Sequence, residues 1–208
     1  REMCMVCSWT PMCKKCDVSL TVHKYNPVMK CHYCGYTIKQ VEICGACGSP
    51  KMSKLGIGTQ KIEEEIFKHL GKEIRVKRMD WDTTRKKTSF QNIIDQFEQK
   101  EIDILVGTQM VSKGLDFDHV GLVGVIQADD LLHYPDFRSY ERCFQLLTQV
   151  SGRSRKKNER GKVILQTFDP NHWVIKKVME YDFKSLYKQE LADRKHFKYP
   201  PYFKLIKL

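Results

Sequence analysis

Long apolar segments are missing from this 208-residue sequence, whose longest uninterrupted apolar runs, such as 120–126, have only the length of a β-strand. A helix that crosses a bilayer needs about 20 apolar residues, so we expect no insertion into a membrane. No apolar signal segment opens the chain, which favours a cytoplasmic protein. The sequence also has no Gly-x-x-x-x-Gly-Lys-Ser/Thr loop, and therefore no phosphate cradle of that type.

Acidic side chains are the minority among the charged ones. The sequence has 25 Asp and Glu against 36 Lys and Arg, which gives a formal net charge of +11 at pH 7. This balance favours an anionic partner, and nucleic acid is the first candidate.

Cysteine is concentrated near the start of the chain, where eight of the nine cysteines form four CxxC pairs within 47 residues. The outer pairs are Cys4/Cys7 and Cys44/Cys47, and the inner pairs are Cys13/Cys16 and Cys31/Cys34. Two residues between cysteines let both thiolates of a tight turn face one metal ion. Eight thiolates are enough for two closed, structural Cys4 zinc sites. We therefore expect a small domain over residues 1–50 that binds two Zn²⁺ ions.

The spacing of the pairs favours a nested arrangement. The inner pairs are separated by 14 residues, close to zinc-ribbon spacing, which leaves the outer pairs to join each other. Pairing in chain order remains an alternative, as do ligation by His23 or His32 and disulfides in place of zinc. The ninth cysteine, Cys143, lies on an apolar helix face, where we expect a small buried hydrophobe.

Downstream of a Gly-Ser-Pro turn at 48–50, the apolar pattern alternates between helix and strand. Helices are expected over 59–70, 89–99 and 138–150, with a long helix from about 172, and strands over 73–79, 102–106, 122–126 and 162–167. Thr59 is a candidate N-cap of the first helix, and Gly71 is its expected stop. Such alternation predicts an α/β fold with a mainly parallel sheet and helices on both faces.

Two loops of this predicted sheet carry most of the chemistry. Residues 107–117 follow a buried strand and concentrate small, hydroxyl and charged groups where ligands of parallel sheets bind. Residues 149–157 bring together guanidinium and ammonium groups suited to phosphates. An ordinary polar loop and a solvated basic loop are the alternative interpretations.

Several segments resemble the PriA family of replication-restart DNA helicases. They are CDVSLTVH and CHYCGY around the inner cysteines, LGIGTQKIEEEI at 55–66, ILVGTQMVSKGLDFDHVGLVGVIQAD at 104–129, YPDFRSYER at 134–142, QLLTQVSGR at 145–153 and KVILQTFDP at 162–170. These matches follow the family order across essentially the whole chain. The resemblance implies a zinc-binding domain at 1–50, a RecA-like second helicase lobe at 51–195, and the start of a truncated C-terminal domain at 196–208.

The resemblance also implies a function. Family members are superfamily 2 helicases that move 3′ to 5′ with ATP and Mg²⁺ and restart stalled forks in the bacterial cytoplasm, at the nucleoid. The implied partners are branched or forked DNA, single-stranded-DNA-binding protein, and primosome or helicase-loading proteins. Because the first motor lobe is not part of this chain, we expect the chain alone not to hydrolyse ATP.

Residue roles carry over from the family's motifs. The matching positions are Thr108, Gly114 and Asp116 in motif V, and Gln149, Gly152 and Arg153 in motif VI. Motif V links nucleotide to DNA, and motif VI faces the nucleotide. Arg153 is implied to stabilise charge on the transferring phosphoryl group, as an arginine finger does.

Motif VI departs from the family pattern GRxGR. Arg155 stands at the glycine position, and Lys156 stands at the second arginine. Lysine cannot make the planar bidentate contact of arginine, so this departure weakens the catalytic interpretation. A non-catalytic zinc-ribbon scaffold that binds fork DNA and a motor-dead paralogue therefore remain alternatives.

Restoring the arginine tests this departure. In a protein that also contains the first lobe, Lys156→Arg is expected to raise ATP turnover because the guanidinium regains a bidentate contact, while DNA affinity stays unchanged. Phosphate release and fork-DNA titration measure the two effects. Unchanged or lower turnover would contradict the assignment.

Overall fold

The chain folds as two units in a computed structural model that describes residues 2–22, 28–54, 58–80, 87–108, 119–152, 155–156 and 159–206. Unit 1 contains residues 1–56, 124–148 and 165–208, and unit 2 contains residues 57–123 and 149–164. The Cys-rich segment therefore shares a unit with helices from the second half of the chain. The predicted boundaries at 50 and 195 stay predictions.

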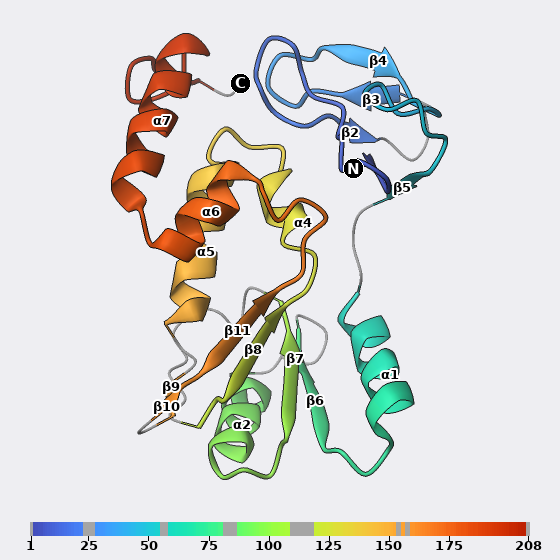
Figure 1. Cartoon of the computed structure of the whole chain (residues 1–208), viewed down its shortest axis with the longest axis vertical. Helices are drawn as coiled ribbons and strands as arrows, with labels where there is room; N and C mark the ends of the chain where they lie inside the picture. The colour runs from blue at the N-terminus through green and yellow to red at the C-terminus, as the bar shows by residue number, and fades with distance from the viewer. Residues whose placement is uncertain are drawn as a thin grey trace. The chain divides into compact units, whose positions relative to one another are not determined.

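The Cys-rich segment is built from short antiparallel strands (Figure 1). Strand β1 (Glu2–Cys4) pairs with β5 (Met52–Lys54), which joins the two ends of the segment. Strands β2 (Thr21–Val22), β3 (Val28–Lys30) and β4 (Thr37–Lys39) form a three-stranded sheet in that order. Its buried core consists of Cys13, Val18, Leu20, Met29 and Cys31. A core of this size is too small to hold about 50 residues without a further constraint.

Helices make up the rest of unit 1. They are α4 (Asp129–Leu132), α5 (Ser139–Ser151, whose last three residues belong to unit 2), α6 (Trp173–Glu180) and α7 (Phe183–His196). Their buried core contains Ala128, Leu132, Cys143, Phe144, Leu147, Val174, Ile175, Val178 and Leu186. Cys143 is fully buried there, which confirms the predicted apolar role, and burial raises its thiol pKa to about 12.

The single long helix predicted from about residue 172 is wrong, because the chain breaks between α6 and α7. Tyr181 takes a left-handed conformation (φ 53°) at the end of α6. Asp182 then caps α7, where its carboxylate accepts a 3.0 Å hydrogen bond from the backbone N–H of Ser185. Lys177 lies 2.9 Å from the same carboxylate. An aspartate in this position favours a new helix start over continuation of the old helix.

Unit 2 contains helix α1 (Thr59–Leu70), strand β6 (Val76–Met79), helix α2 (Lys87–Glu98) and strand β7 (Ile104–Gly107). Strands β6 and β7 pair in parallel. Met79, Ile93, Ile94 and Ile102 form the buried core between these elements.

Helix α1 ends as predicted and begins differently. Gly71 stops it with φ 90° and donates its N–H to the Phe67 carbonyl. The N-cap, however, is Gly58, so the prediction of Thr59 is wrong. The Thr59 hydroxyl instead donates a 2.6 Å hydrogen bond to the carboxylate of Asp80, just beyond β6. This tertiary partner draws the hydroxyl away from the helix end.

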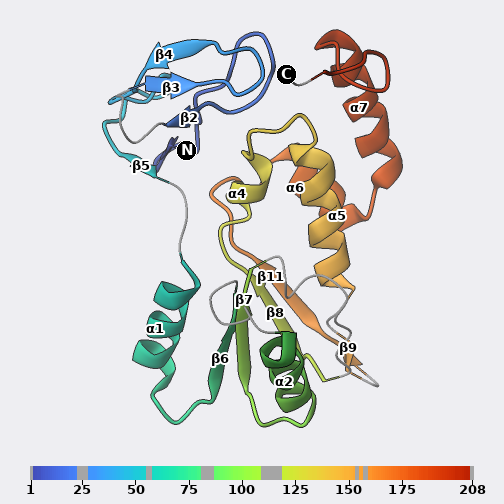
Figure 2. The ribbon, with the colours of Figure 1, turned by 180° about the vertical axis from the view of Figure 1, so that it is seen from behind.

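A second parallel pair consists of β8 (Leu122–Val125) and β11 (Lys162–Leu165). The N–H of Lys162 donates to the Gly121 carbonyl, and that of Gln166 to the Val125 carbonyl, both at 2.9 Å. Residue numbers thus rise together along both strands, and the view from behind in Figure 2 shows them side by side. The short strands β9 (Arg155–Lys156) and β10 (Glu159–Arg160) form an antiparallel hairpin before β11. Two parallel pairs confirm the α/β class predicted from the alternating pattern.

Glu190 is a buried acid on α7, only 7% exposed. Burial raises the pKa of its carboxyl group to about 7; the Arg194 charge opposes this shift, and the charges of Asp193 and Glu141 reinforce it. A carboxyl group whose pKa is raised by folding contributes stability that is lost as pH rises through the folded pKa. The free energy of unfolding should therefore fall between pH 4.5, the ordinary value, and about 7.

Glu190→Gln is expected to flatten this pH dependence, since an amide carries no charge to bury. At pH 8 the variant should be more stable than the parent by about 3 kcal/mol, and at pH 4.5 the two should nearly agree. Urea unfolding over a pH series measures the difference. Glu64→Gln makes the same change at an exposed position of α1 and should leave the profile unchanged. Identical profiles for parent and Glu190→Gln would refute this account.

Candidate metal centres

The eight paired cysteines gather into two groups of four. In the outer cluster, formed by both outer pairs, the four sulfur atoms lie within 4.8 Å of one another. The Sγ atoms of Cys4 and Cys47 are 3.6 Å apart, and those of Cys7 and Cys44 are 3.5 Å apart. The inner cluster, formed by both inner pairs, meets the same limit, with 3.6 Å between the Sγ atoms of Cys13 and Cys34. The structure thus brings the pairs together in the nested arrangement.

All four CxxC turns share one backbone geometry. The first cysteine of each pair accepts, at its carbonyl, a hydrogen bond of 3.0–3.1 Å from the fourth residue after it. These fourth residues all have positive φ: they are Ser8 (63°), Asp17 (49°), Gly35 (73°) and Gly48 (71°). Glycine and, less readily, aspartate tolerate this conformation. The repeat was not anticipated from the sequence, although a glycine directly after the second cysteine of two pairs is a signal for it.

Backbone N–H groups point at the sulfur atoms. The Cys44 sulfur accepts from the N–H groups of Ala46 and Cys47, and the Cys4 sulfur accepts from that of Val6, all at 3.4 Å. Although burial acts to raise the pKa of Cys44, the hydrogen bonds to its sulfur outweigh it and lower the pKa to about 6. Donors of this kind favour the thiolate, which is the form that binds metal.

These clusters fit a structural zinc ion. A tetrahedral site with Zn–S bonds of about 2.3 Å places its sulfur atoms about 3.8 Å apart, close to the spacings observed. Disulfides are excluded among these cysteines, which are all free, with Sγ separations far beyond the S–S bond length of about 2.05 Å. Among the described residues, no histidine belongs to either cluster. His23 is not one of the described residues.

The residues matched to helicase motifs are described only in part. Gly114, Asp116 and Arg153 lie outside the described residues. Thr108 is exposed directly after β7, at the carboxyl end of that strand. Gln149 is exposed on α5, Gly152 follows the end of this helix, and Lys156 is described only by its backbone in β9. The proposed roles of all six motif positions and of Lys156 stay predictions.

The segment at 134–142 forms a salt-bridged turn before and into α5. The Asp136 carboxylate accepts a 2.8 Å hydrogen bond from the N–H of Arg138 and lies 3.0 Å from the Arg142 guanidinium. Phe137 belongs to this turn, and the guanidinium carbons of Arg138 and Arg194 lie 5.0 and 5.3 Å from the centre of its ring.

Asp129 is a buried acid whose structural role sequence reasoning missed. It is 1% exposed at the start of α4, just beyond β8. Its carboxylate accepts hydrogen bonds from the Thr167 hydroxyl at 3.0 Å and from the Phe168 N–H at 3.2 Å. The carboxylate thereby fixes the loop that follows β11 against the end of β8, at the edge where parallel sheets hold ligands.

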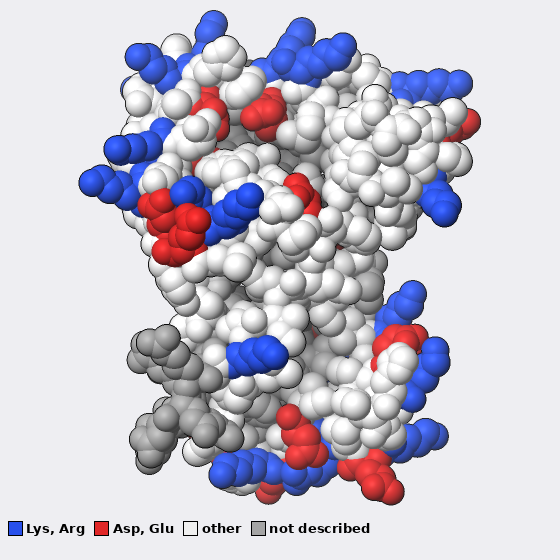
Figure 3. All heavy atoms as spheres, viewed as in Figure 1, with Lys and Arg blue, Asp and Glu red and all other residues white. Residues whose placement is uncertain are grey.

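On the face shown in Figure 3, Lys and Arg side chains are scattered mainly along the edges, with Asp and Glu side chains among them, and they do not gather into one basic patch. Among the described helices, none is long and apolar enough to pass through a bilayer.

Two family models match the chain. The PriA DNA helicase Cys-rich region matches residues 13–39, and the helicase conserved C-terminal domain matches residues 52–165. Proteins named replication restart protein PriA are similar over nearly the whole chain. Identity is 46% over 98% of the chain in Bacillus subtilis, 44% over 99% in Synechocystis, and 36% over 100% in Thermotoga maritima. The chain spans only 25%, 25% and 28% of these relatives.

Removing one sulfur tests the metal assignment. Cys44→Ala is expected to lower the zinc content from two ions per chain to about one, because the outer cluster loses a ligand. Cys143→Ala is the matched control and should keep both ions, since this cysteine is buried outside the clusters. Elemental analysis by mass spectrometry measures the content. Two ions retained by Cys44→Ala would contradict the ligand set.

Proposed function

The chain belongs to the PriA helicase family, whose Cys-rich region and conserved C-terminal helicase domain it contains, and we propose that it is the second motor lobe of an ATP-dependent 3′-to-5′ DNA helicase. In this proposal the helicase recognises stalled or branched forks and initiates primosome assembly for replication restart. Because the chain spans about a quarter of its curated relatives, the activity is proposed for a protein that also holds the first lobe.

One observation carries the proposal: a PriA-type Cys-rich region directly precedes a helicase C-terminal domain in the same chain. Many folds could support nucleic-acid binding, and a basic composition alone would not separate them. A scaffold that only binds DNA has no need of a second motor lobe. The combination therefore favours a motor protein over a simple binding module.

The proposed mechanism assigns the chemistry to the lobe-facing loops. ATP and Mg²⁺, bound mainly by the first lobe, would supply the phosphoryl group and its counter-charge. Arg153 would add a guanidinium to the developing charge, with Gln149 and Gly152 holding its loop. Thr108 and Asp116 would couple this site to DNA, with Gly114 allowing close approach of the backbone. Lys156 would contribute a weaker cationic contact than the arginine it replaces.

The two Cys4 clusters have a structural role in this proposal. Two Zn²⁺ ions would fix the Cys-rich domain, which in turn would hold the DNA junction or dock single-stranded-DNA-binding protein and primosome or helicase-loading proteins. The site of action would be the bacterial cytoplasm, at nucleoid-associated forks. The protein as a whole would bind DNA, in keeping with its net charge of +11.

A second function is favoured by Arg155 and Lys156. Their departure from the family's motif VI supports a fork-binding scaffold without turnover. This alternative shares DNA binding with the helicase and differs in ATP hydrolysis, so one assay separates them.

Fork-stimulated ATP hydrolysis is the deciding measurement. A protein that joins this lobe to a first lobe is expected to hydrolyse ATP when fork DNA is added, and Arg153→Ala should lower the rate about 10³-fold or more. The 208-residue chain alone serves as the blank. Gln145→Ala, a substitution at an exposed position of α5, should leave the rate intact. Absence of turnover in the joined protein with fork binding retained would establish the scaffold instead.

A further inference from the structure

The two cysteine clusters have different surroundings. In the inner cluster, Cys13 and Cys31 belong to the buried core of the Cys-rich domain, where they pack with Val18, Leu20 and Met29. The outer cluster lies outside that core. Between its first two cysteines, Met5 is 43% exposed and Val6 is 62% exposed. Two of the four ligands of the outer cluster, Cys7 and Cys47, are exposed, whereas in the inner cluster only Cys34 is exposed.

The inner cluster is also attached to the helices of unit 1. The Tyr199 hydroxyl, beyond the end of α7, donates a 2.5 Å hydrogen bond to the carbonyl of the ligand residue Cys16. The hydroxyl of Ser19, three residues further along, donates to the carbonyl of His133. These two bonds connect residues 16–19 to the residue that follows α4 and to the segment that follows α7.

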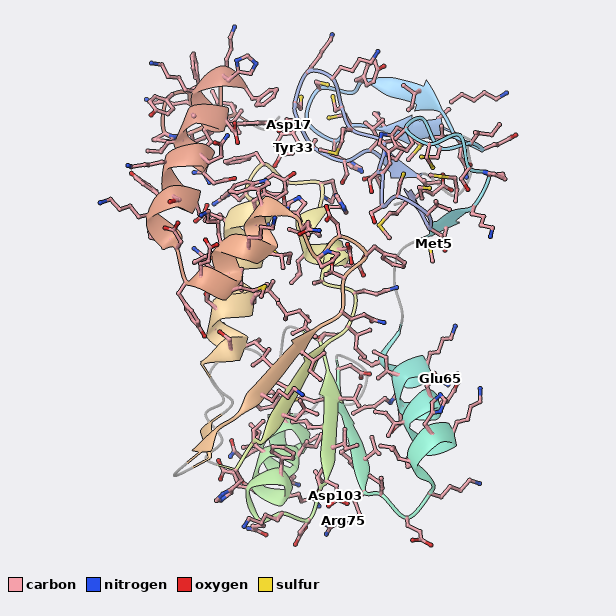
Figure 4. The ribbon with its side chains drawn as sticks, in the orientation of Figure 1. Met5, Asp17, Tyr33, Glu65, Arg75 and Asp103 are labelled. Atoms are coloured by element: carbon pink, nitrogen blue, oxygen red, sulfur yellow. The ribbon has the colours of Figure 1, made fainter. Side chains whose placement is uncertain are left out.

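Three aromatic side chains pack against one another at this attachment. The rings of Phe137 and Tyr199 are stacked, with centroids 4.6 Å apart and planes 11° apart. Tyr33, which lies between Cys31 and Cys34, meets both rings edge-on at 6.3 and 5.9 Å. Figure 4 shows Tyr33 and Asp17 where the Cys-rich domain meets the helices of unit 1. We call Tyr33, Phe137 and Tyr199 the aromatic clamp.

The clamp is fixed from the helical side. Arg194 on α7 lies over the Phe137 ring and is held by Glu141 on α5, 2.6 Å away. A ring between stacked and cationic partners gains contacts that it loses if the domain moves away. The CxxC turns of the inner cluster therefore cannot open without breaking contacts that extend to α5 and α7.

We propose that the two metal sites differ in lability: the outer cluster releases its zinc first, and the aromatic clamp retains the zinc of the inner cluster. Release of a structural zinc ion requires the CxxC turns around it to open, so that the thiolates leave the metal one after another. At the outer cluster this opening disturbs the exposed turn and the β1–β5 pair. At the inner cluster it must also separate Tyr33 and Cys16 from Phe137 and Tyr199.

The consequence is a domain that opens in two stages. A chelator or thiol oxidant first frees the outer cysteines and the β1–β5 pair, while the inner cluster stays docked on the helices. This inference rests on the proposal that both clusters bind zinc, and the starting zinc content tests that proposal separately.

Timed alkylation of the zinc-loaded protein tests the order without any substitution. Excess 4-(2-pyridylazo)resorcinol takes up released zinc, and N-ethylmaleimide added at intervals marks the freed cysteines for mass spectrometry. Two phases of one ion each are expected, with Cys4, Cys7, Cys44 and Cys47 marked in the first. A single phase, or inner cysteines marked first, would overturn the proposal. A starting content below two ions would overturn the zinc assignment itself.

Variants of the clamp test its part in retention. Phe137→Leu and Tyr199→Phe are expected to speed the slow phase by up to about tenfold and to leave the fast phase unchanged. Phe183→Leu makes the same change as Phe137→Leu at a 53% exposed ring on α7, outside the clamp, and should alter neither phase. Equal acceleration of both phases by the clamp variants, or none, would show that the clamp does not govern release.

Discussion

The convergence of eight thiols on two points is the constraint on which the Cys-rich domain depends. Its strands have two or three residues each, and its buried core is a handful of side chains. Neither could offset the conformational entropy of about 50 ordered residues. The four CxxC turns have the same backbone hydrogen bond, and they place their sulfur atoms close enough for four of them to bind one metal ion. The β1–β5 pair and the small sheet are then consequences of those fixed turns.

The helical part of unit 1 is held by different means. Apolar side chains from α4 to α7 form a continuous core, and the buried acid Asp129 accepts hydrogen bonds from the loop after β11. A buried carboxylate with several donors costs little, since its charge is met by fixed dipoles. The same part of the chain supplies Phe137 and Tyr199 to the inner cluster. The Cys-rich domain, which depends on metal ions, and the helical part, which depends on an apolar core, are therefore connected through these two aromatic side chains.

Spacing and periodicity were enough to predict much of this chain. The nested cysteine pairs, the end of α1 at Gly71 and the parallel strand pairs follow from local patterns that tertiary contacts reinforce. Prediction failed where a single polar side chain decides between local alternatives. Asp182 interrupts an apolar period that would otherwise continue, and Asp80 takes the Thr59 hydroxyl from its helix end. The partners of Asp129 and Tyr199 are distant in sequence, so no local pattern could reveal them.

The pairing of β1 with β5 has a consequence for how such a domain is acquired. Glu2 stands opposite Lys54 in the ladder, so the chain enters and leaves the Cys-rich domain at neighbouring points. A host fold can accept an insert of this kind at one surface loop, because its own loop ends stay a short distance apart. The outer cysteines lie next to this point and would hold the two ends together once a metal ion is bound. A domain whose two ends meet in this way can be inserted whole into a loop without any change to the sheet of the host fold.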